Sequence, residues 1–170
     1  MEKAKNDHAK LTFVLFAVYF AALVWIILFK MQFSFDTLPH FRALNLIPFS
    51  GAATRTNRPE MIMNIIIFMP FGLYLSMIKP QWPFWKKVLP MAGVSLLFEA
   101  LQYVFAIGGT DITDFIGNTL GGIVGIGFYV VLSKKLKGNT NKVLNTLALI
   151  GTICVVLLGL LVSGVVTYRF

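Results

Sequence analysis

Residues 95–125 read S-L-L-F-E-A-L-Q-Y-V-F-A-I-G-G-T-D-I-T-D-F-I-G-N-T-L-G-G-I-V-G, two apolar stretches joined by a short polar segment. Glu99 and Gln102 lie inside the first apolar stretch, and Asp111, Asp114 and Asn118 open the second. The whole chain has only 7 acidic residues, and three of them fall in this window. Because ionisable groups are costly in hydrocarbon, their concentration within apolar sequence indicates a functional site.

The rest of the chain is equally apolar. Hydrophobic residues make up 57% of its 170 residues and charged ones 13%, and the mean hydropathy of +0.77 lies outside the range of ordinary soluble domains. Five apolar runs of about 18 to 24 residues can each cross a hydrocarbon core of about 30 Å. They are Leu11–Phe29, Met61–Ile78, Val88–Ile107, Phe115–Leu132 and Val143–Val166. We therefore expect an all-α, polytopic integral membrane protein with about five transmembrane helices, forming a single membrane domain over residues 1–170.

The basic residues predict the orientation of these helices. The N-terminal tail, the second loop and the fourth loop carry ten of them: Lys3, Lys5, Lys10, Lys79, Lys86, Lys87, Lys134, Lys135, Lys137 and Lys142. The remaining segments carry five: Lys30, Arg42, Arg55, Arg58 and Arg169. Since cytoplasmic segments are enriched in Lys and Arg, residues 1–10 are expected to be a cytoplasmic tail and the C-terminus to lie outside. The net charge of +8 then reflects topology and attraction to anionic lipid, and we expect no nucleic-acid partner.

This orientation brings polar residues from three helices and the first loop to one depth, at the outer leaflet. The predicted ligand-binding residues are Glu99, Gln102, Asp111, Asp114, Asn118, Asn64, Asn45 and Arg42. The inner halves of the same helices carry few polar groups. We therefore expect a site that faces outward.

Small residues predict close helix packing. Gly117, Gly121 and Gly125 recur at every fourth position, a spacing that lets two membrane helices approach closely. We call these three residues the glycine face. It suits packing within the chain and also an oligomer of several copies. Pro70 removes a backbone hydrogen bond from the second apolar run and is expected to kink it.

The first outer loop has two parts. Residues 38–49 are largely apolar and contain Pro48, and are expected to form a short interfacial or re-entrant element. Residues 50–59 read S-G-A-A-T-R-T-N-R-P and are expected to be a flexible loop.

Four motifs follow one another in a recognisable order. They are N-L-I-P-F at 45–49, Asn64 followed by F-x-P-F-G at 68–72, E-x-x-Q at 99–102, and D-x-x-D-x-x-x-N-T-x-G-G-x-x-G at 111–125. Over residues 40–130 the chain resembles the VanZ-like family of bacterial membrane proteins, leaving the fifth run at 143–166 as an additional helix. The resemblance implies a role in resistance to the lipoglycopeptide teicoplanin. It marks as characteristic the positions Asn45, Pro48, Asn64, Pro70, Gly72, Glu99, Gln102, Asp111, Asp114, Asn118, Gly121 and Gly122.

The chain departs from this family pattern near the first aspartate. Relatives often carry an Arg shortly before it and a further Asp between the two aspartates, where this chain has Gly108-Gly109 and Thr113. A cationic partner for the carboxylates would then have to come from the first loop, from Arg42, Arg55 or Arg58.

Purely structural roles compete with binding at these positions. Asp111 and Asp114 are spaced like a helix N-cap and its partner at the third helical position. Glu99 gains nothing from capping, but a protonated Glu99 that bonds Gln102, Asn64 or Asn118 would hold helices together.

Three function classes remain open. The favoured one is a binding protein of the bacterial cytoplasmic membrane that holds a lipidated molecule, such as a lipoglycopeptide or a lipid-linked cell-wall intermediate, among membrane lipids. The second is a small membrane-embedded enzyme with Glu99 and Asp114 as acid and base. The third is a transporter. It is the least favoured, because transporters are commonly built from internal repeats and these five spans show none. No cofactor and no metal ligands are assigned, although the carboxylates leave a divalent cation open, and no hydrolase motif favours the enzyme.

Overall fold

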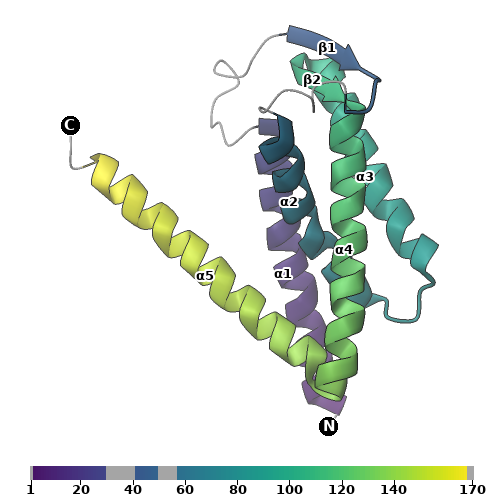
Figure 1. Ribbon diagram of the computed structural model, residues 1–170. Helices are drawn as coiled ribbons and strands as arrows, with labels where there is room; N and C mark the ends of the chain where they lie inside the picture. The colour runs from purple at the N-terminus through teal and green to yellow at the C-terminus, as the bar shows by residue number, and fades with distance from the viewer. Residues whose placement is uncertain (1, 30–40, 50–56, 168–170) are drawn as a thin grey trace.

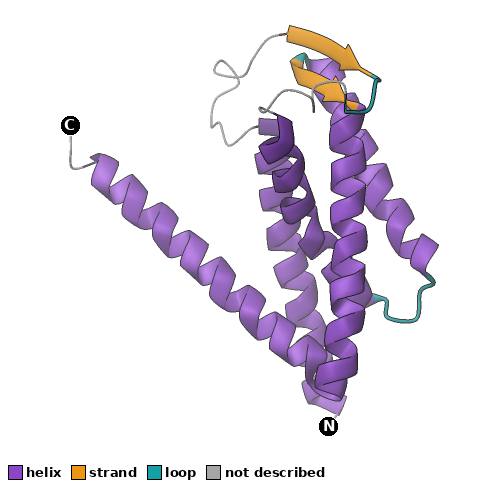
Figure 2. Ribbon diagram, viewed as in Figure 1, coloured by secondary structure: helices purple, strands orange, loops and turns teal. Residues whose placement is uncertain are grey.

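The computed structural model describes residues 2–29, 41–49 and 57–167 of the chain. In order, the elements are α1 (Glu2–Phe29), β1 (Phe41–Asn45), α2 (Asn57–Ile78), α3 (Phe84–Phe105), β2 (Ile107–Asp111), α4 (Ile112–Leu136), the 3-10 helix η2 (Lys137–Asn139) and α5 (Thr140–Thr167). Helices make up most of the described chain (Figure 2), as the predicted all-α class requires.

Four segments are long and apolar enough to cross a membrane. They are His8–Leu28, Pro59–Ile78, Phe84–Phe105 and Ile112–Leu157. The last has 46 residues and runs through α4, η2 and much of α5, whereas one crossing needs about 20 residues. The architecture is that of a membrane protein, and the count of five spans stays a prediction.

Helices α1 to α4 lie side by side as a bundle, and the two strands cover one of its ends (Figure 1). The chain's N-terminus and the α4–α5 turn lie at the opposite end (Figure 1). Helix α5 leans away from the bundle along its length (Figure 1). Near its start it is held to α1, because Thr12 Oγ1 lies 3.1 Å from Asn145 Oδ1 and Asn145 Nδ2 donates to the His8 carbonyl at 3.1 Å.

The glycine face packs against α2. A Cβ atom added at Gly121 would collide with the backbone of Ile65, and one at Gly125 with the carbonyl oxygen of Met69. The prediction that these glycines approach another helix closely is confirmed, because only residues without a side chain permit this contact. An oligomer through the glycine face would therefore have to displace α2 of the same chain.

The core lies where α1 to α4 meet. Its fully buried members include Leu23, Phe68 and Met91, one from each of α1, α2 and α3. Tyr19 of α1 donates its hydroxyl to the carbonyl of Ile67 at 2.8 Å, three residues before Pro70. This bond fastens α1 to α2 near the proline.

The sheet was not predicted. Strands β1 and β2 pair in parallel, with Phe41 opposite Ile107 and Asn45 opposite Asp111. The interfacial element expected at 38–49 therefore includes a strand, and residues 107–111 form its partner instead of a helix end and a loop. Helix α3 stops because Ala106 is left-handed, with φ 55°, and its N–H returns to the carbonyls of Gln102 and Tyr103. Pairing then satisfies the backbone groups on the facing edges of the two strands.

The loop expected at 50–59 is shorter than predicted. Helix α2 already begins at Asn57, while residues 50–56 lie outside the described residues.

Candidate functional site

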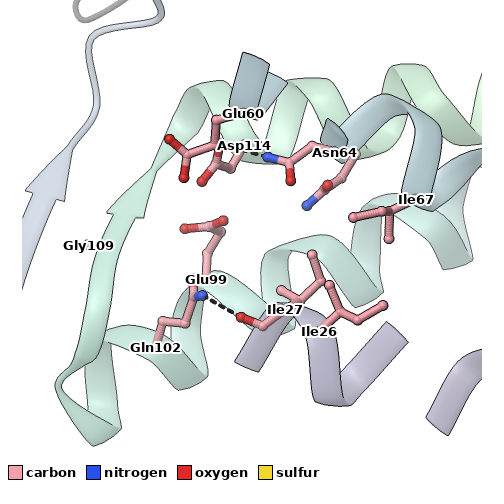
Figure 3. Close-up of a pocket in the computed structure, with 10 residues that line it drawn as sticks. Ile26, Ile27, Glu60, Asn64, Ile67, Glu99, Gln102, Gly109 and Asp114 are labelled. Atoms are coloured by element: carbon pink, nitrogen blue, oxygen red, sulfur yellow. Dashed lines mark hydrogen bonds between the residues drawn. The ribbon is translucent and has the colours of Figure 1, made fainter. Parts of the chain in front are cut away.

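A cavity of about 240 Å³ lies near the strand-covered end of the bundle, and we call it the polar cavity (Figure 3). Its described lining is Ile26, Ile27, Glu60, Asn64, Ile67, Glu99, Gln102, Gly109, Asp114 and Asn118. These residues come from α1, α2, α3, β2 and α4. The structure thus brings together the predicted site residues Asn64, Glu99, Gln102, Asp114 and Asn118.

Glu99 connects α3 to the second strand. Its side chain is 4% exposed, and Oε2 accepts a hydrogen bond from the backbone N–H of Asp111 at 2.9 Å. Its own carbonyl accepts from the Thr110 hydroxyl at 2.9 Å. Figure 3 shows the carboxylate pointing toward Asp114 across the cavity. Glu99 therefore lines the cavity and also holds β2, a partner that the sequence did not suggest.

Two amide side chains fix the helices around the cavity. Asn64 of α2 donates from Nδ2 to Asp114 Oδ1 of α4 at 2.8 Å. Gln102 of α3 donates from Nε2 to the carbonyl of Ile27 at 3.0 Å, near the end of α1 where helix carbonyls lack intrahelical partners. Each amide nitrogen therefore uses one of its two N–H bonds within the protein.

Asn118 is the most buried of the polar residues that line the cavity. It is 1% exposed, and its Nδ2 donates to Ser95 Oγ of α3 at 3.0 Å. Its Oδ1 accepts no hydrogen bond from any residue that the structure describes. An unsatisfied buried acceptor is uncommon in native proteins and calls for a physical explanation.

Asp111 and Asn45 stand beside the cavity, outside its described lining. Asp111 is the N-cap of α4, as its spacing suggested, with its carboxylate accepting from the N–H of Thr113 at 2.7 Å. Its second oxygen accepts from Asn45 Nδ2 at 2.9 Å. Thr113 Oγ1 in turn accepts from the N–H of Phe49 at 3.1 Å. These bonds attach the N-L-I-P-F segment to the start of α4.

The remaining predicted residue is Arg42. Its backbone belongs to β1, opposite Gly108, while its side chain lies outside the described residues. The same holds for the side chains of Arg55 and Arg58.

Sequence reasoning missed Glu60 as a member of the site. It lies four residues before Asn64 and so shares its face of α2, a spacing that is visible in the sequence. Ser95, the partner of Asn118, was missed in the same way, four residues before Glu99. The apolar lining from Ile26, Ile27 and Ile67 had no signal, because isoleucine is common throughout these helices.

The chemistry of the cavity follows from its side chains. Carboxylates reach it from three helices, at Glu60, Glu99 and Asp114. Its described lining contains no serine, cysteine or histidine, so these residues assemble no hydroxyl, thiol or imidazole nucleophile there. Within the described part of the chain, no three His, Cys, Asp or Glu side chains are placed to hold a metal ion together.

Comparisons with known proteins agree on one family. The family model described as VanZ/LLP1 matches residues 16–133, more than half of the chain. The chain is 40% identical over 146 residues to "Protein VanZ" from Enterococcus faecium, an alignment that covers 85% of this chain and 88% of that protein. No solved structure matches the chain.

Proposed function

The chain belongs to the VanZ/LLP1 family, and from this premise we propose that it binds an amphiphile, a lipid-linked or lipidated molecule, at the bacterial cytoplasmic membrane. Binding takes place at an outward-facing polar site. We further propose that this binding contributes to envelope homeostasis or to resistance against teicoplanin-type glycopeptides, the role that the resemblance implies.

The polar cavity carries the proposal. It combines carboxylates and amides with the apolar side chains of Ile26, Ile27 and Ile67. Small-molecule sites typically have such mixed walls, in which a few polar groups orient a ligand held by apolar surface. A cavity near one end of apolar helices suits a headgroup whose hydrocarbon tails remain in the bilayer.

The basic residues support the outward orientation. Lys79, Lys86 and Lys87 flank the α2–α3 connection, and four further lysines flank the α4–α5 turn: Lys134, Lys135, Lys137 and Lys142. The α4–α5 turn lies opposite the strands (Figure 1). The positive-inside rule therefore supports a cytoplasmic N-terminus and an outward-facing polar cavity, and this orientation requires α5 to be a fifth span if the C-terminus lies outside.

An enzyme acting on an envelope lipid is the second candidate. Its supporting observation is that Glu99 and Asp114 face the same cavity from α3 and α4 (Figure 3). One carboxyl would donate a proton and the other would accept one, with or without a divalent cation.

Neutral amides at the two carboxylates test the binding site. Glu99→Gln keeps an oxygen for the N–H of Asp111, and Asp114→Asn keeps one for Asn64, so both variants are expected to fold and insert. Because each loses its ionisable group, we expect both to lose protection against teicoplanin in a sensitive host. The measurement is resistance plotted against the amount of each variant in the membrane.

Asp111→Asn is the matched control, since Asp111 lies outside the described lining of the cavity and an Asn still caps a helix. It is expected to retain more resistance per molecule than the other two variants. If all three variants fall on one line through the wild type, resistance follows abundance alone and the proposed binding site is wrong.

A further inference from the structure

One buried acceptor in the polar cavity lacks a donor among the residues that the structure describes. Asn118 lines the cavity and is 1% exposed, yet its Oδ1 accepts no hydrogen bond from the described residues. Leaving such an oxygen buried without a donor lowers stability. A ligand that enters the cavity can supply the missing N–H or O–H.

The other polar groups around the cavity are also suited to accept. The side-chain nitrogens of Asn64 and Gln102 each use one of their two N–H bonds within the protein, and their amide oxygens can accept. The carboxyl groups of Glu60, Glu99 and Asp114 also line the cavity, and carboxyl oxygens are acceptors of hydrogen bonds. The described lining therefore presents acceptors to a ligand from both α3 and α4.

We propose that the polar cavity binds a protonated primary amine, the ammonium group of an amphiphile's headgroup, and that Asn118 Oδ1 accepts one of its N–H bonds. An ammonium has three donors and no acceptor, which complements this lining. A hydroxyl would bring its own lone pairs toward the carboxylates, and a phosphate would bring negative charge toward them. This inference rests on the proposed function, because it specifies the headgroup of the amphiphile.

The size of the cavity favours a headgroup over a bare metal ion. Its volume is about 240 Å³, whereas one water molecule in the liquid occupies about 30 Å³. Calcium requires six to eight oxygens at about 2.3–2.6 Å. Among the described residues no three carboxylates converge in that way.

The test compares lipids that differ only in the amine. The full-length chain in detergent is titrated with phosphatidylethanolamine and with N-acetyl phosphatidylethanolamine, and the bound lipid is quantified by native mass spectrometry. Acetylation removes the charge and two of the three N–H donors. We expect the dissociation constant for the acetylated lipid to be about tenfold higher, the effect of one lost charge-assisted hydrogen bond.

Two further ligands identify the source of the amine and the competing chemistry. Free ethanolamine carries the ammonium without acyl chains, and we expect it not to compete at concentrations where the lipid saturates. A diglucosyl diacylglycerol presents only hydroxyl groups, and we expect it to bind no better than the acetylated lipid.

Two variants locate the effect at Asn118. Asn118→Leu removes this acceptor with little change in size and leaves the carboxyl groups in place, so the preference for the free amine should fall clearly below tenfold. Ser76→Ala is the matched control: Ser76 Oγ is the other buried side-chain atom without a partner among the described residues, and Ser76 is not in the described lining of the cavity. This control should keep the tenfold preference.

Each outcome decides between defined alternatives. Equal binding of both phosphatidylethanolamines by the wild-type chain would overturn the amine while leaving an amphiphile-binding function intact. Preference for the glycolipid would replace the amine by a sugar headgroup. Strong competition by free ethanolamine would show that the amine binds without acyl chains, and it would refute an amphiphile ligand. Absence of binding by every lipid would refute the proposed function itself.

Discussion

At the scale of single residues, polar side chains that line the cavity or stand beside it also hold the fold together. Glu99 receives the N–H of Asp111, Asp111 caps α4, and Asn45 donates to Asp111. Each of these bonds also offsets the free energy that it costs to remove a polar group from water. A substitution here therefore affects stability unless the new side chain keeps the same donor or acceptor.

Asp111 gives a direct measure of this structural role. Asp111→Ala removes the cap on Thr113 and the acceptor for Asn45, and we expect it to lower the free energy of unfolding by about 1–2 kcal/mol. Asp111→Asn keeps an oxygen for the cap and should lose about half as much. The measurement is thermal unfolding in detergent followed by circular dichroism. Equal stability of the Ala variant and the wild type would show that the cap contributes little.

At the scale of elements, the contact between α2 and α4 positions the cavity. The glycine face lets α4 approach the backbone of α2. In the same helix pair, Asn64 Nδ2 lies 2.8 Å from Asp114 Oδ1. Close packing of α2 against α4 thus helps to set the distance between their polar side chains in the cavity.

Leucine substitutions test this contact. At Gly121 a side chain would meet the backbone of Ile65, which cannot move aside as a side chain would. We expect Gly121→Leu to cost more than about 3 kcal/mol, beyond ordinary overpacking, and to reduce the amount of folded protein in the membrane. Gly127→Leu is the control, because a Cβ atom added at Gly127 would meet no atom within 4 Å, and it should be tolerated. Similar yields of both variants by fluorescence-detected gel filtration would contradict the contact.

The sequence was sufficient for the helices, the glycine face and five of the cavity residues, because apolar run length and spacings of three and four residues are local signals. It was insufficient for the strands. Parallel pairing of β1 with β2 joins Asn45 to Asp111 across more than sixty residues, and neither strand has an alternating pattern. The partner of the Glu99 carboxylate was likewise hidden, since a backbone N–H carries no sequence signature.

At the scale of the whole molecule, polarity is divided between the two ends of the bundle. The polar cavity and the strands lie at one end, and the lysines around the α4–α5 turn lie at the other (Figure 1). Because lysine-rich connections tend to be retained in the cytoplasm, we expect this division to set the direction of the chain in the membrane. The site can meet an envelope molecule only if the strand-covered end faces outward.

Accessibility of single cysteines tests that direction. Cys154 is exposed on α5, and it is first replaced by serine so that it cannot contribute to labelling. Leu46→Cys then places a thiol near the strands, at a position that is 65% exposed, and Gln81→Cys places one in the exposed α2–α3 connection. In intact cells we expect a membrane-impermeant maleimide to label the first variant and to label the second only after the cells are opened. Both thiols must react in opened cells for the comparison to count. The reverse pattern would turn the polar cavity toward the cytoplasm, and the ligand would then have to be an inner-leaflet lipid or a cytoplasmic intermediate.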